Sequence, residues 1–520
     1  MPTPSSEVIV IGGGTNGLAC AARLAKGGRR VTLLESAWEL GGGAATVEFA
    51  PGYRVSGLAH VLNVLDARVA NGMDLQRHGL SYAATSLAST ALAANGDHLV
   101  LDGAAGSGLT GNVTAEEKRA WTEMRTRLMA FAGVLGPFKT MAPPRLSRAA
   151  GNEWLRLAKL GLGVRQLGKE EFREFLRMIL INVADAVEDD LTDDRLRGLL
   201  AFDTVLGAWL GPRSPNSLIL LLNRLSGEAA GQRAALGLPK GGMGSVAAAM
   251  RKAAEAAGVK VRTGAQVERI IVEGDRATGV ILASGEELKA GLVVSAINPR
   301  TTFRNLVGPR PLDAGFYRQT AHIRSRGGAA KLHLALKGAP DFRGADLKSR
   351  LVIAPGVNAV EESFNAVKYG EVPKRPVMEI IIPSAHEAGF APDGHHVLSA
   401  IVQFAPHAPK AGLDAARAEM LENTLAVLEE NAPGIRALIA HAELLMPEDI
   451  EARYGMVGGN WHHGELAVEQ MLFLRPLREA AQYATPLPGL WLAGAGSHPG
   501  GGISGASGWN AAERILKEAA

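Results

Sequence analysis

The chain has 520 residues, of which 47% are hydrophobic and 21% are charged. This amino-acid composition is that of an ordinary globular protein. The chain is long enough for about two to four domains with a large buried core. The formal net charge of +3 is too small to indicate a nucleic-acid partner, and we expect none. Cys20 is the only cysteine, which excludes an intrachain disulfide, a Cys-x-x-Cys redox pair and a cysteine metal cluster.

The sequence predicts neither secretion nor insertion into a membrane. It contains no run of about 18 consecutive apolar residues, the minimum for a transmembrane helix. Only Met1 to Ser6 precede the first expected strand, so we expect no signal or transit peptide. A single cysteine fits a reducing compartment, and we expect a cytoplasmic protein.

The first expected elements are a buried parallel strand over 8–11, a glycine turn and a helix. The turn has the pattern G-x-G-x-x-G, and its candidate cofactor-binding residues are Gly12, Gly14, Thr15, Asn16 and Gly17. The first glycine permits a tight turn, the second lets the backbone approach a pyrophosphate, and the third lets the helix pack on the strand. The free N–H groups at the helix start would face the phosphates.

A second strand is expected over 30–34, and it ends at Glu35, which Ser36 follows. An acid about twenty residues after the glycine turn accepts hydrogen bonds from ribose hydroxyls, so it favours FAD or NAD over NADP. Strand, turn, helix, strand and acid occur in the order of a Rossmann-type dinucleotide site.

Two further glycine turns favour FAD. The first follows the acid and contributes the candidates Gly42, Gly43, Ala44 and Ala45. The second follows an expected strand near the end of the chain and contributes Gly494, Ala495, Gly502, Ile503 and Ser504. We expect a helix to begin at 502–504 and direct its dipole at the flavin's pyrimidine edge. One FAD would then be held by both ends of the chain.

A third segment is expected to complete the same domain. A helix opens at Gly241–Gly244, and strands are expected over 259–261, 265–272, 277–282 and 292–295. Val267 and Ala296 are further candidate cofactor-binding residues. No ribose acid follows Gly244 at the right distance, so the sequence predicts one dinucleotide site.

Several motifs resemble the phytoene desaturase-like FAD-dependent oxidoreductase family, and in particular a branch named for a pyridine nucleotide-disulphide oxidoreductase domain. They are Leu40–Thr46, Lys240–Gly244, Gly458–His463, Phe473–Pro476 and Gly494–Gly502. The resemblance implies non-covalent FAD in a domain built from discontinuous segments, with a substrate domain inserted between them. With Cys20 alone, the chain cannot perform the disulphide chemistry in that branch's name.

The predicted fold is α/β, with a discontinuous Rossmann-type FAD-binding domain and an inserted α+β substrate domain containing a mixed sheet. We assign 1–74, 237–310 and 472–520 to the FAD domain, and 75–236 and 311–471 to the substrate domain. Helices are expected over 115–131, 169–187 and 411–431. Strands are expected over 330–336, with one buried face, and over 377–382 and 397–404.

A basic segment over 145–165 interleaves arginines and lysine with tryptophan and leucines. It has two interpretations, a core helix with a solvated basic face or a peripheral contact with a membrane through which a lipid enters.

The candidate catalytic residues are His498, Asn460, His462, His60 and Asp203. His498 either lies beside the isoalloxazine ring or braces its glycine turn. Asn460, His462 and the adjacent His463 either line the pocket or occupy a loop tip. Asp203 is interpreted as a catalytic base or as a helix cap. No metal-ligand spacing occurs, so we predict no metal site.

The leading hypothesis is an FAD-dependent dehydrogenase or desaturase. It would move hydride from a small hydrophobic or alicyclic substrate to flavin N5 and be re-oxidised by a quinone or oxygen. An amine oxidase, a redox-neutral isomerase and a non-catalytic FAD-containing binding protein stay open as alternatives. A homodimer is also left open.

Overall fold

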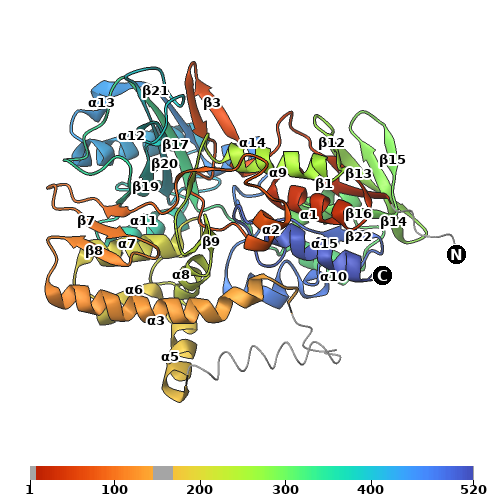
Figure 1. Ribbon diagram of the computed structural model, residues 1–520, viewed down its shortest axis with the longest axis horizontal. Coiled ribbons are helices and arrows are strands. Elements are labelled where there is room, and N and C mark those ends of the chain that lie inside the picture. The colour runs from red at the N-terminus through yellow and green to blue at the C-terminus, as the bar shows by residue number, and fades with distance from the viewer. Residues whose placement is uncertain (1–6, 144–167, 519–520) are drawn as a thin grey trace.

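The computed structural model describes residues 7–143 and 168–518. The basic segment 145–165, for which we considered membrane contact, lies outside these residues. Figure 1 shows two lobes, one built on the sheet that contains β1 and the other on the sheet that contains β17. The first lobe holds both the beginning and the end of the chain (Figure 1).

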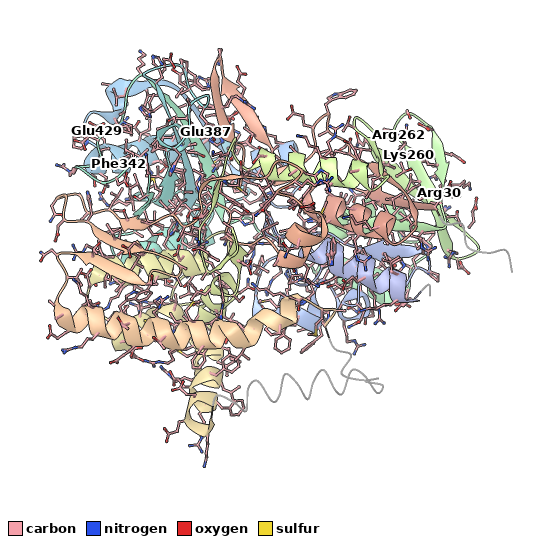
Figure 2. All side chains as sticks on the ribbon, viewed as in Figure 1. Arg30, Lys260, Arg262, Phe342, Glu387 and Glu429 are labelled. Carbon is pink, nitrogen blue, oxygen red and sulfur yellow. The ribbon has the colours of Figure 1, made fainter. Side chains whose placement is uncertain are left out.

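The first lobe has a five-stranded parallel sheet with the order β12-β2-β1-β16-β22. Its strands are β1 (Glu7–Ile11), β2 (Arg30–Leu34), β12 (Lys260–Arg262), β16 (Leu292–Ser295) and β22 (Leu490–Leu492). Segments from the start, the middle and the end of the chain therefore meet in one sheet. Figure 2 places Arg30 of β2 and Lys260 and Arg262 of β12 together at the far end of this lobe.

Both faces of this sheet are buried, which explains the continuous apolar run in β1. Val8 and Val10 pack in a core with α1 (Thr15–Lys26), α9 (Gly244–Ala256) and α15 (Ala506–Glu518). Ile9 and Ile11 point the other way because side chains alternate along a strand. That second core is closed by β13 (Val267–Glu273), β14 (Arg276–Leu282), β15 (Glu287–Lys289), the π-helix η2 (Thr301–Val307) and α10 (Ala314–Ala321).

The second lobe has an eight-stranded sheet with the order β21-β17-β20-β19-β18-β6-β7-β8. Its strands are β6 (Ser89–Ala91), β7 (Leu99–Asp102), β8 (Gly108–Gly111), β17 (Ala329–Leu336), β18 (Arg350–Ile353), β19 (Val377–Ile381), β20 (His396–Gln403) and β21 (Ile439–Leu445). β18 and β6 pair in parallel and the other neighbours pair antiparallel. The predicted mixed sheet is confirmed, and both predicted inserts contribute strands to it. The boundaries of the predicted domains stay a prediction.

Helices cover both faces of the mixed sheet. One face packs on α12 (Leu413–Asn431) and α13 (Ile435–Leu438). The other face packs on α3 (Ala115–Lys139), α5 (Lys169–Leu180), α6 (Val183–Asp190), α7 (Asp194–Val205), α8 (Leu218–Leu225) and α11 (Val357–Lys368). All eight residues of β17 are buried, because α12 and α13 cover one face and the segment 47–60 covers the other, so the expectation of one buried face was wrong.

The single helix predicted over 169–187 is also wrong, because α5 ends at Leu180 and α6 begins at Val183. Ile181 is extended between them, and the side chain of Asn182 caps the new helix by accepting a hydrogen bond from Asp185 N.

Smaller elements connect the lobes. They are β3 (Thr46–Ala50), β4 (Tyr53–Ser56), α2 (Ala67–Gly72), β5 (Tyr82–Ala84), β9 (Glu228–Ala229), β10 (Gln232–Arg233), β11 (Leu238–Pro239), α14 (Pro447–Tyr454) and the 3-10 turns η1 (Gly42–Ala44), η3 (Pro383–Ala385), η4 (Val468–Gln470), η5 (Leu472–Leu474) and η6 (Arg478–Ala480). Within residues 7–143 and 168–518, no helix is both long enough and apolar enough to span a membrane.

The two ends of the chain meet where α15 packs against α1. A Cβ added at Gly508 of α15 would lie 1.8 Å from Asn16 O, and one added at Gly17 would lie 1.9 Å from Gly12 O. Both glycines therefore let backbone touch backbone around the nucleotide turn.

Replacing Gly508 with alanine tests this contact. Because the new Cβ would overlap Asn16 O, α15 must move, and we expect Gly508→Ala to lower the free energy of unfolding by about 1–3 kcal/mol or more. The bound FAD per chain should fall as well, since Asn16 belongs to the turn. Thermal unfolding and the flavin absorbance of the purified protein measure the two effects.

Gly136→Ala is the matched control, since a Cβ at that helical position in α3 meets nothing within 4 Å. Equal melting temperatures and FAD contents for the two variants would contradict the close packing.

Candidate functional site

The turn after β1 is held by the acid that ends β2. Glu35 accepts hydrogen bonds from Gly13 N at 2.7 Å and from Ala37 N at 2.9 Å. Ser36 Oγ donates to the same carboxylate at 3.0 Å. This places a partly exposed carboxylate at the edge of the turn, where the sequence predicted the ribose acid.

An open space adjoins the first two glycine turns. A Cβ at Gly14 would meet nothing within 4 Å, and one at Gly42 would meet only Gly14 Cα at 3.8 Å. Gly14 and Gly41 nevertheless form a parallel bridge, so the two turns are fixed relative to each other. This is the geometry in which bare backbone approaches a pyrophosphate.

The start of α1 adds a polar group without a partner. Thr15 and Asn16 are buried, and Asn16 Oδ1 has no hydrogen-bond partner among the described residues. Buried polar atoms in native proteins are almost always paired, so an unpaired acceptor beside an open turn fits a bound ligand. The free N–H groups of the helix N-terminus favour an anionic one.

The turn near the end of the chain packs against the same sheet edge. A Cβ at Gly494 would lie 2.5 Å from Ala296 O, and Ala296 N donates to Ile11 O. Ala495 is buried, and its carbonyl accepts a hydrogen bond from Arg475 at 2.9 Å.

The final helix begins at Ala506, later than the 502–504 that we predicted. Gly502 and Gly505 have φ of +112° and +67°, which a right-handed helix cannot include. Ser504 Oγ accepts a hydrogen bond from Ala506 N, while Ile503 is half-buried against the core of the first lobe.

A strand-like segment over 57–66 runs between the early and late turns. Gly57 N and Ala59 N donate to Ala45 O and Gly43 O at 2.8 Å and 3.0 Å. At the other end Asp66 N donates to Ser504 O at 3.1 Å. The turn residues 42–45 and 502–504 are thus bridged by one segment, with His60 in its middle.

Val267 lies in β13 with its side chain in the core below the sheet. Two residues before Val267, Ala265 N donates a hydrogen bond to Glu35 O at 2.8 Å. The role of Val267 in binding a cofactor stays a prediction.

His60 connects this cradle to the mixed sheet. Its Nε2 donates to Glu379 Oε1 at 3.0 Å, and its Nδ1 accepts from Lys331 Nζ at 2.9 Å. All three side chains are at most 3% exposed. Glu379 lies on β19 and Lys331 on β17, so the predicted residue His60 faces the centre of the second lobe.

Arg350 of β18 continues the chain of charges from Glu379 to Asp203. Its Nε donates to Glu379 Oε2 at 2.6 Å, and its terminal nitrogen binds Asp203 Oδ1. Asp203 lies within α7, whose N-cap is Asp193, so the interpretation of Asp203 as a helix cap was wrong. The structure joins two predicted residues, His60 and Asp203, through two that the sequence did not single out.

Burial and neighbouring charges set the protonation of this group. Burial, with the positive charge of Lys331, lowers the pKa of His60 to about 4, so its ring is neutral at pH 7. Burial lowers the pKa of Lys331 to about 7. Burial alone would raise the pKa of Glu379, but Arg350 and His60 outweigh it and hold that pKa well below its usual range.

The loop with Asn460 and the two histidines is buried against the late turn. Asn460 is 1% exposed; its Nδ2 donates to Arg326 O, and its Oδ1 accepts from His462 N, both at 2.9 Å. His462 packs directly on Gly501, where a Cβ would lie 2.5 Å from its Nδ1. Burial lowers the pKa of His462 to about 3 and that of His463 to about 4. Asn460 is buried and the two histidines are half-buried, so their place in the pocket wall stays a prediction.

Arg475 holds this loop in place; it lies in the motif 473–476 but was not predicted as a site residue. The side chain is 1% exposed and donates to the carbonyls of His462, Gly464, Glu465, Gln470 and Ala495. Burial lowers the pKa of Arg475 to about 10. The sequence signal that could have identified Arg475 is its position just before a proline in an otherwise apolar stretch.

His498 is 3% exposed, and its Nε2 donates to Phe138 O at 2.6 Å. Its backbone carbonyl accepts from Tyr483 Oη at 3.0 Å. Burial lowers the pKa of His498 to about 4, so the ring is neutral. These contacts are those of a residue that braces the turn, and a catalytic role for His498 stays a prediction.

The comparisons with known proteins agree with this geometry. A model of the family described as flavin containing amine oxidoreductase matches residues 17–516. The chain belongs to this family. It is 27% identical to the rat pyridine nucleotide-disulfide oxidoreductase domain-containing protein 2, covering 99% of this chain and 94% of that protein. The resemblance stated from the sequence motifs is confirmed.

Two other proteins that this chain resembles are named for different activities. The phytoene desaturase (neurosporene-forming) of Cereibacter sphaeroides is 31% identical over 61% of this chain and 59% of its own length. The structure of cyclohexylamine oxidase from Brevibacterium oxydans superposes with a TM-score of 0.57 at 16% identity, covering 99% of each chain. The predicted fold class is thereby confirmed.

FAD is the cofactor of this family, and the residues present fit it. The open backbone at Gly14 and Gly42, the acid Glu35 and the unpaired Asn16 Oδ1 form a site for a dinucleotide with an unphosphorylated ribose. In the described part of the chain no three His, Cys, Asp or Glu side chains gather as metal ligands would.

Adding a methyl group at Gly14 tests the pyrophosphate position. The new Cβ of Gly14→Ala would touch no protein atom and the position has φ of −69°, so the unfolding temperature of the apoprotein should stay unchanged. The methyl group would occupy the space of the phosphates, and we expect at least about a 10-fold loss of FAD affinity. Fluorescence titration of apoprotein with FAD measures it.

Glu39→Gln, at an exposed position in the same region, is the control and should bind FAD normally. Full FAD affinity in Gly14→Ala would show that the phosphates lie elsewhere.

The lowered pKa of Lys331 predicts a pH dependence of stability. In the unfolded chain its pKa is about 10.4, so between about pH 7 and 10 the unfolded state binds the extra proton. Stability from this residue should therefore rise with pH by up to about 1.4 kcal/mol per pH unit. Urea unfolding of wild type and Lys331→Met at several pH values measures the difference, which should grow in favour of wild type as pH rises.

Lys337→Met removes an exposed lysine just beyond β17 and should leave the pH slope of wild type unchanged. Parallel pH profiles for wild type and Lys331→Met would contradict the lowered pKa.

Proposed function

We propose that the protein is an FAD-dependent dehydrogenase or desaturase that acts on a hydrophobic or alicyclic substrate, with re-oxidation by a quinone or oxygen. The supporting observation is the buried pair of Lys331 and His60, which links the FAD cradle to the mixed sheet. Bound FAD would accept a hydride at N5.

Introducing a C=C bond also releases a proton, and the site needs a group that can take it. His60 is held in one orientation, because Nε2–H donates to Glu379 and Nδ1 faces Lys331. Lys331, with a pKa of about 7, can both bind and release a proton near neutral pH. We infer that this pair accepts the substrate's proton, while Glu379 and Arg350 fix its geometry.

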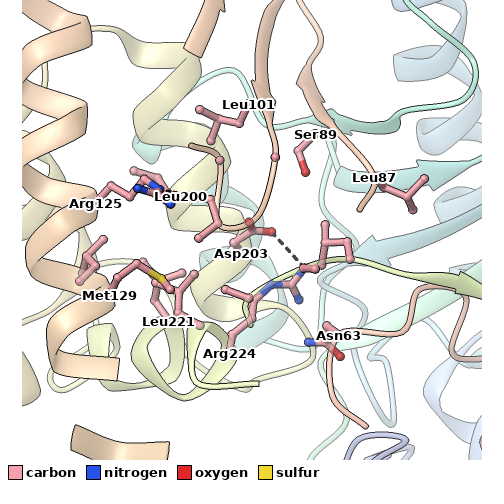
Figure 3. A pocket seen from close by; sticks show the side chains of 18 of the residues that line it. Asn63, Leu87, Ser89, Leu101, Arg125, Met129, Leu200, Asp203, Leu221 and Arg224 are labelled. Carbon is pink, nitrogen blue, oxygen red and sulfur yellow. Dashed lines mark hydrogen bonds and ion pairs between the residues drawn. The ribbon is translucent and has the colours of Figure 1, made fainter. Parts of the chain in front are cut away.

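The apolar surroundings support a hydrophobic substrate. A small cavity of about 60 Å³ lies among α3, α7 and α8, and leucines are the most frequent residues in its wall (Figure 3). Asn63, in the segment that carries His60, forms part of its wall. The name of the phytoene desaturase relative is in keeping with such a substrate.

An amine oxidase is the second candidate, favoured by the family model and by the likeness to cyclohexylamine oxidase. Against it, the carboxylates nearest the cavity are already paired, since Asp203 and Glu379 both bind Arg350. An ammonium group would find no free anion there.

Anaerobic mixing tests the proposal. Isoprenoids, cyclic ketones and acyl substrates are mixed with the oxidised enzyme, and at least one class should bleach the flavin band at roughly 450 nm. Peroxide release with amines alone, and no bleaching by the apolar panel, would favour the amine oxidase instead.

With a reducing substrate in hand, His60→Leu should lower the rate of flavin reduction by about 100-fold, the usual weight of a proton-transfer group. FAD content should not change. His322→Leu, at an exposed position after α10, is the control. An unchanged reduction rate in His60→Leu would remove the pair from the mechanism.

A further inference from the structure

Arg475 is a buried cation that contacts the late glycine turn, residues 494–502. Every hydrogen bond that its side chain donates within the described residues goes to a backbone carbonyl, among them that of Ala495. Among these residues it forms no ion pair, and the buried carboxylate of Glu465 in the same loop pairs with Arg324 and Arg326 instead. The carbonyl dipoles solvate the guanidinium, but they do not cancel its charge.

One donor of Arg475 has no acceptor. Its Nε atom is buried and without a hydrogen-bond partner in the described part of the chain. Nε lies beside Gly500 of the late turn, where an added Cβ would be 3.7 Å from Nε and 3.1 Å from Leu466 Cδ2. Buried donors are almost always paired and buried charges are almost always compensated, so this arrangement fits a negative group near the turn.

The histidines around the turn carry no charge near neutral pH. Burial, followed by the charge of Arg475, lowers the pKa of His462 to about 3 and that of His463 to about 4. Burial lowers the pKa of His498 to about 4 and that of Lys139, at the end of α3, to about 7. Burial lowers the pKa of Arg475 only to about 10, so it carries a full positive charge at neutral pH.

The segment 57–66 borders the same turn and adds no free anion. Val64 packs against Gly502, and Asp66 N donates to Ser504 O. Asp66 is the one carboxylate of this segment, and it pairs with Arg68 at 2.6 Å. Among the described residues around the turn, no carboxylate therefore compensates Arg475.

Reduction gives FAD a new negative charge. Two electrons and one proton, which binds at N5, leave that charge on N1 and the neighbouring carbonyl oxygen, and a cation nearby stabilises it. The pyrophosphate is anionic in both redox states. A cation near the flavin therefore raises its midpoint potential, while a cation that acts only on the pyrophosphate strengthens the binding of both redox states equally.

We propose that Arg475 stabilises the negative charge of reduced FAD and thereby raises the midpoint potential of the flavin. It acts through its charge, across the backbone of the late turn. Such a charge acts over a longer range in the protein interior than in water, because the effective dielectric constant is lower. The effect is the same whichever substrate reduces the flavin, so it does not rest on the proposed function.

Equilibrium reduction of the FAD-loaded protein against a reference dye measures the midpoint potential without any substrate, with dithionite as the source of electrons. Arg475→Met should shift the balance toward oxidised flavin by at least about 10-fold, which is about 30 mV for a two-electron couple. Arg475→Lys keeps the charge but not the planar fork, and it should stay within about 3-fold of wild type.

Leu466 allows the charge to be neutralised while the carbonyl contacts of Arg475 remain. Leu466→Glu places a carboxylate beside the unpaired Nε and should lower the midpoint potential as Arg475→Met does. Leu466→Gln has nearly the same shape without the charge. It is the matched control and should stay within about 3-fold of wild type.

The pH dependence of the midpoint potential is a second readout, which a purely structural role would not change. With the charge of Arg475 in place, wild type should take up one proton per two electrons from about pH 7 upward, a slope of about 30 mV per pH unit. In Arg475→Met the reduced flavin should keep its N1 proton to higher pH, so the slope near neutral pH should approach about 59 mV.

Equal midpoint potentials in wild type and Arg475→Met would overturn the proposal, as would equal potentials in Leu466→Glu and Leu466→Gln. Weaker binding of FAD in both redox states with an unchanged potential would assign the charge to the pyrophosphate and would also overturn it. If Arg475→Met retains no FAD, the comparison of the two Leu466 variants decides.

Discussion

Glu379 is a carboxylate with 2% exposure on a central strand of the mixed sheet, and the structure around it is arranged to neutralise it. An isolated charge there would be strongly destabilising, and removing one partner of such a buried pair typically costs about 3–5 kcal/mol. Arg350 and His60 occupy its two oxygens. Because they come from β18 and from the segment beside the FAD cradle, one carboxylate ties the two lobes together.

The FAD cradle depends on a different constraint, the absence of side chains. Gly17 brings α1 against the backbone of Gly12 and Gly508 brings α15 against the backbone of Asn16, while Gly14 leaves an open space. The first two positions are filled by the protein itself and the third is left for the cofactor. The same residue type therefore serves packing at one point and ligand access at another, only a few residues away.

The cradle was largely predictable from the sequence, because its signals are local. Gly12 to Glu35 contain strand, turn, helix and acid within one stretch, and the structure forms each of these elements. The late turn was also predicted, but the start of its helix was placed two to four residues too early. The positive φ of Gly502 and Gly505, which prevents helix there, cannot be read from a run rich in glycine.

The buried charges were not predictable, because their partners are distant in the sequence. Lys331 and His333 alternate with leucines, which indicates a strand with one buried face, yet helices cover one face of β17 and the segment 47–60 covers the other. Arg350 lies 147 residues from Asp203, and Glu379 lies 319 residues from His60. An isolated charged residue in an apolar strand gives no sign of which distant group will neutralise it.

The central claim is that one FAD lies between the early and late glycine turns, with His60 joining its cradle to the buried charges. A crystal structure of the FAD-loaded protein tests it most directly. The pyrophosphate should lie over the open backbone at Gly14, the isoalloxazine ring should lie against the segment 57–64, and His60 should still bind Glu379 and Lys331. An isoalloxazine ring away from that segment, or His60 turned out of contact with Glu379, would contradict it.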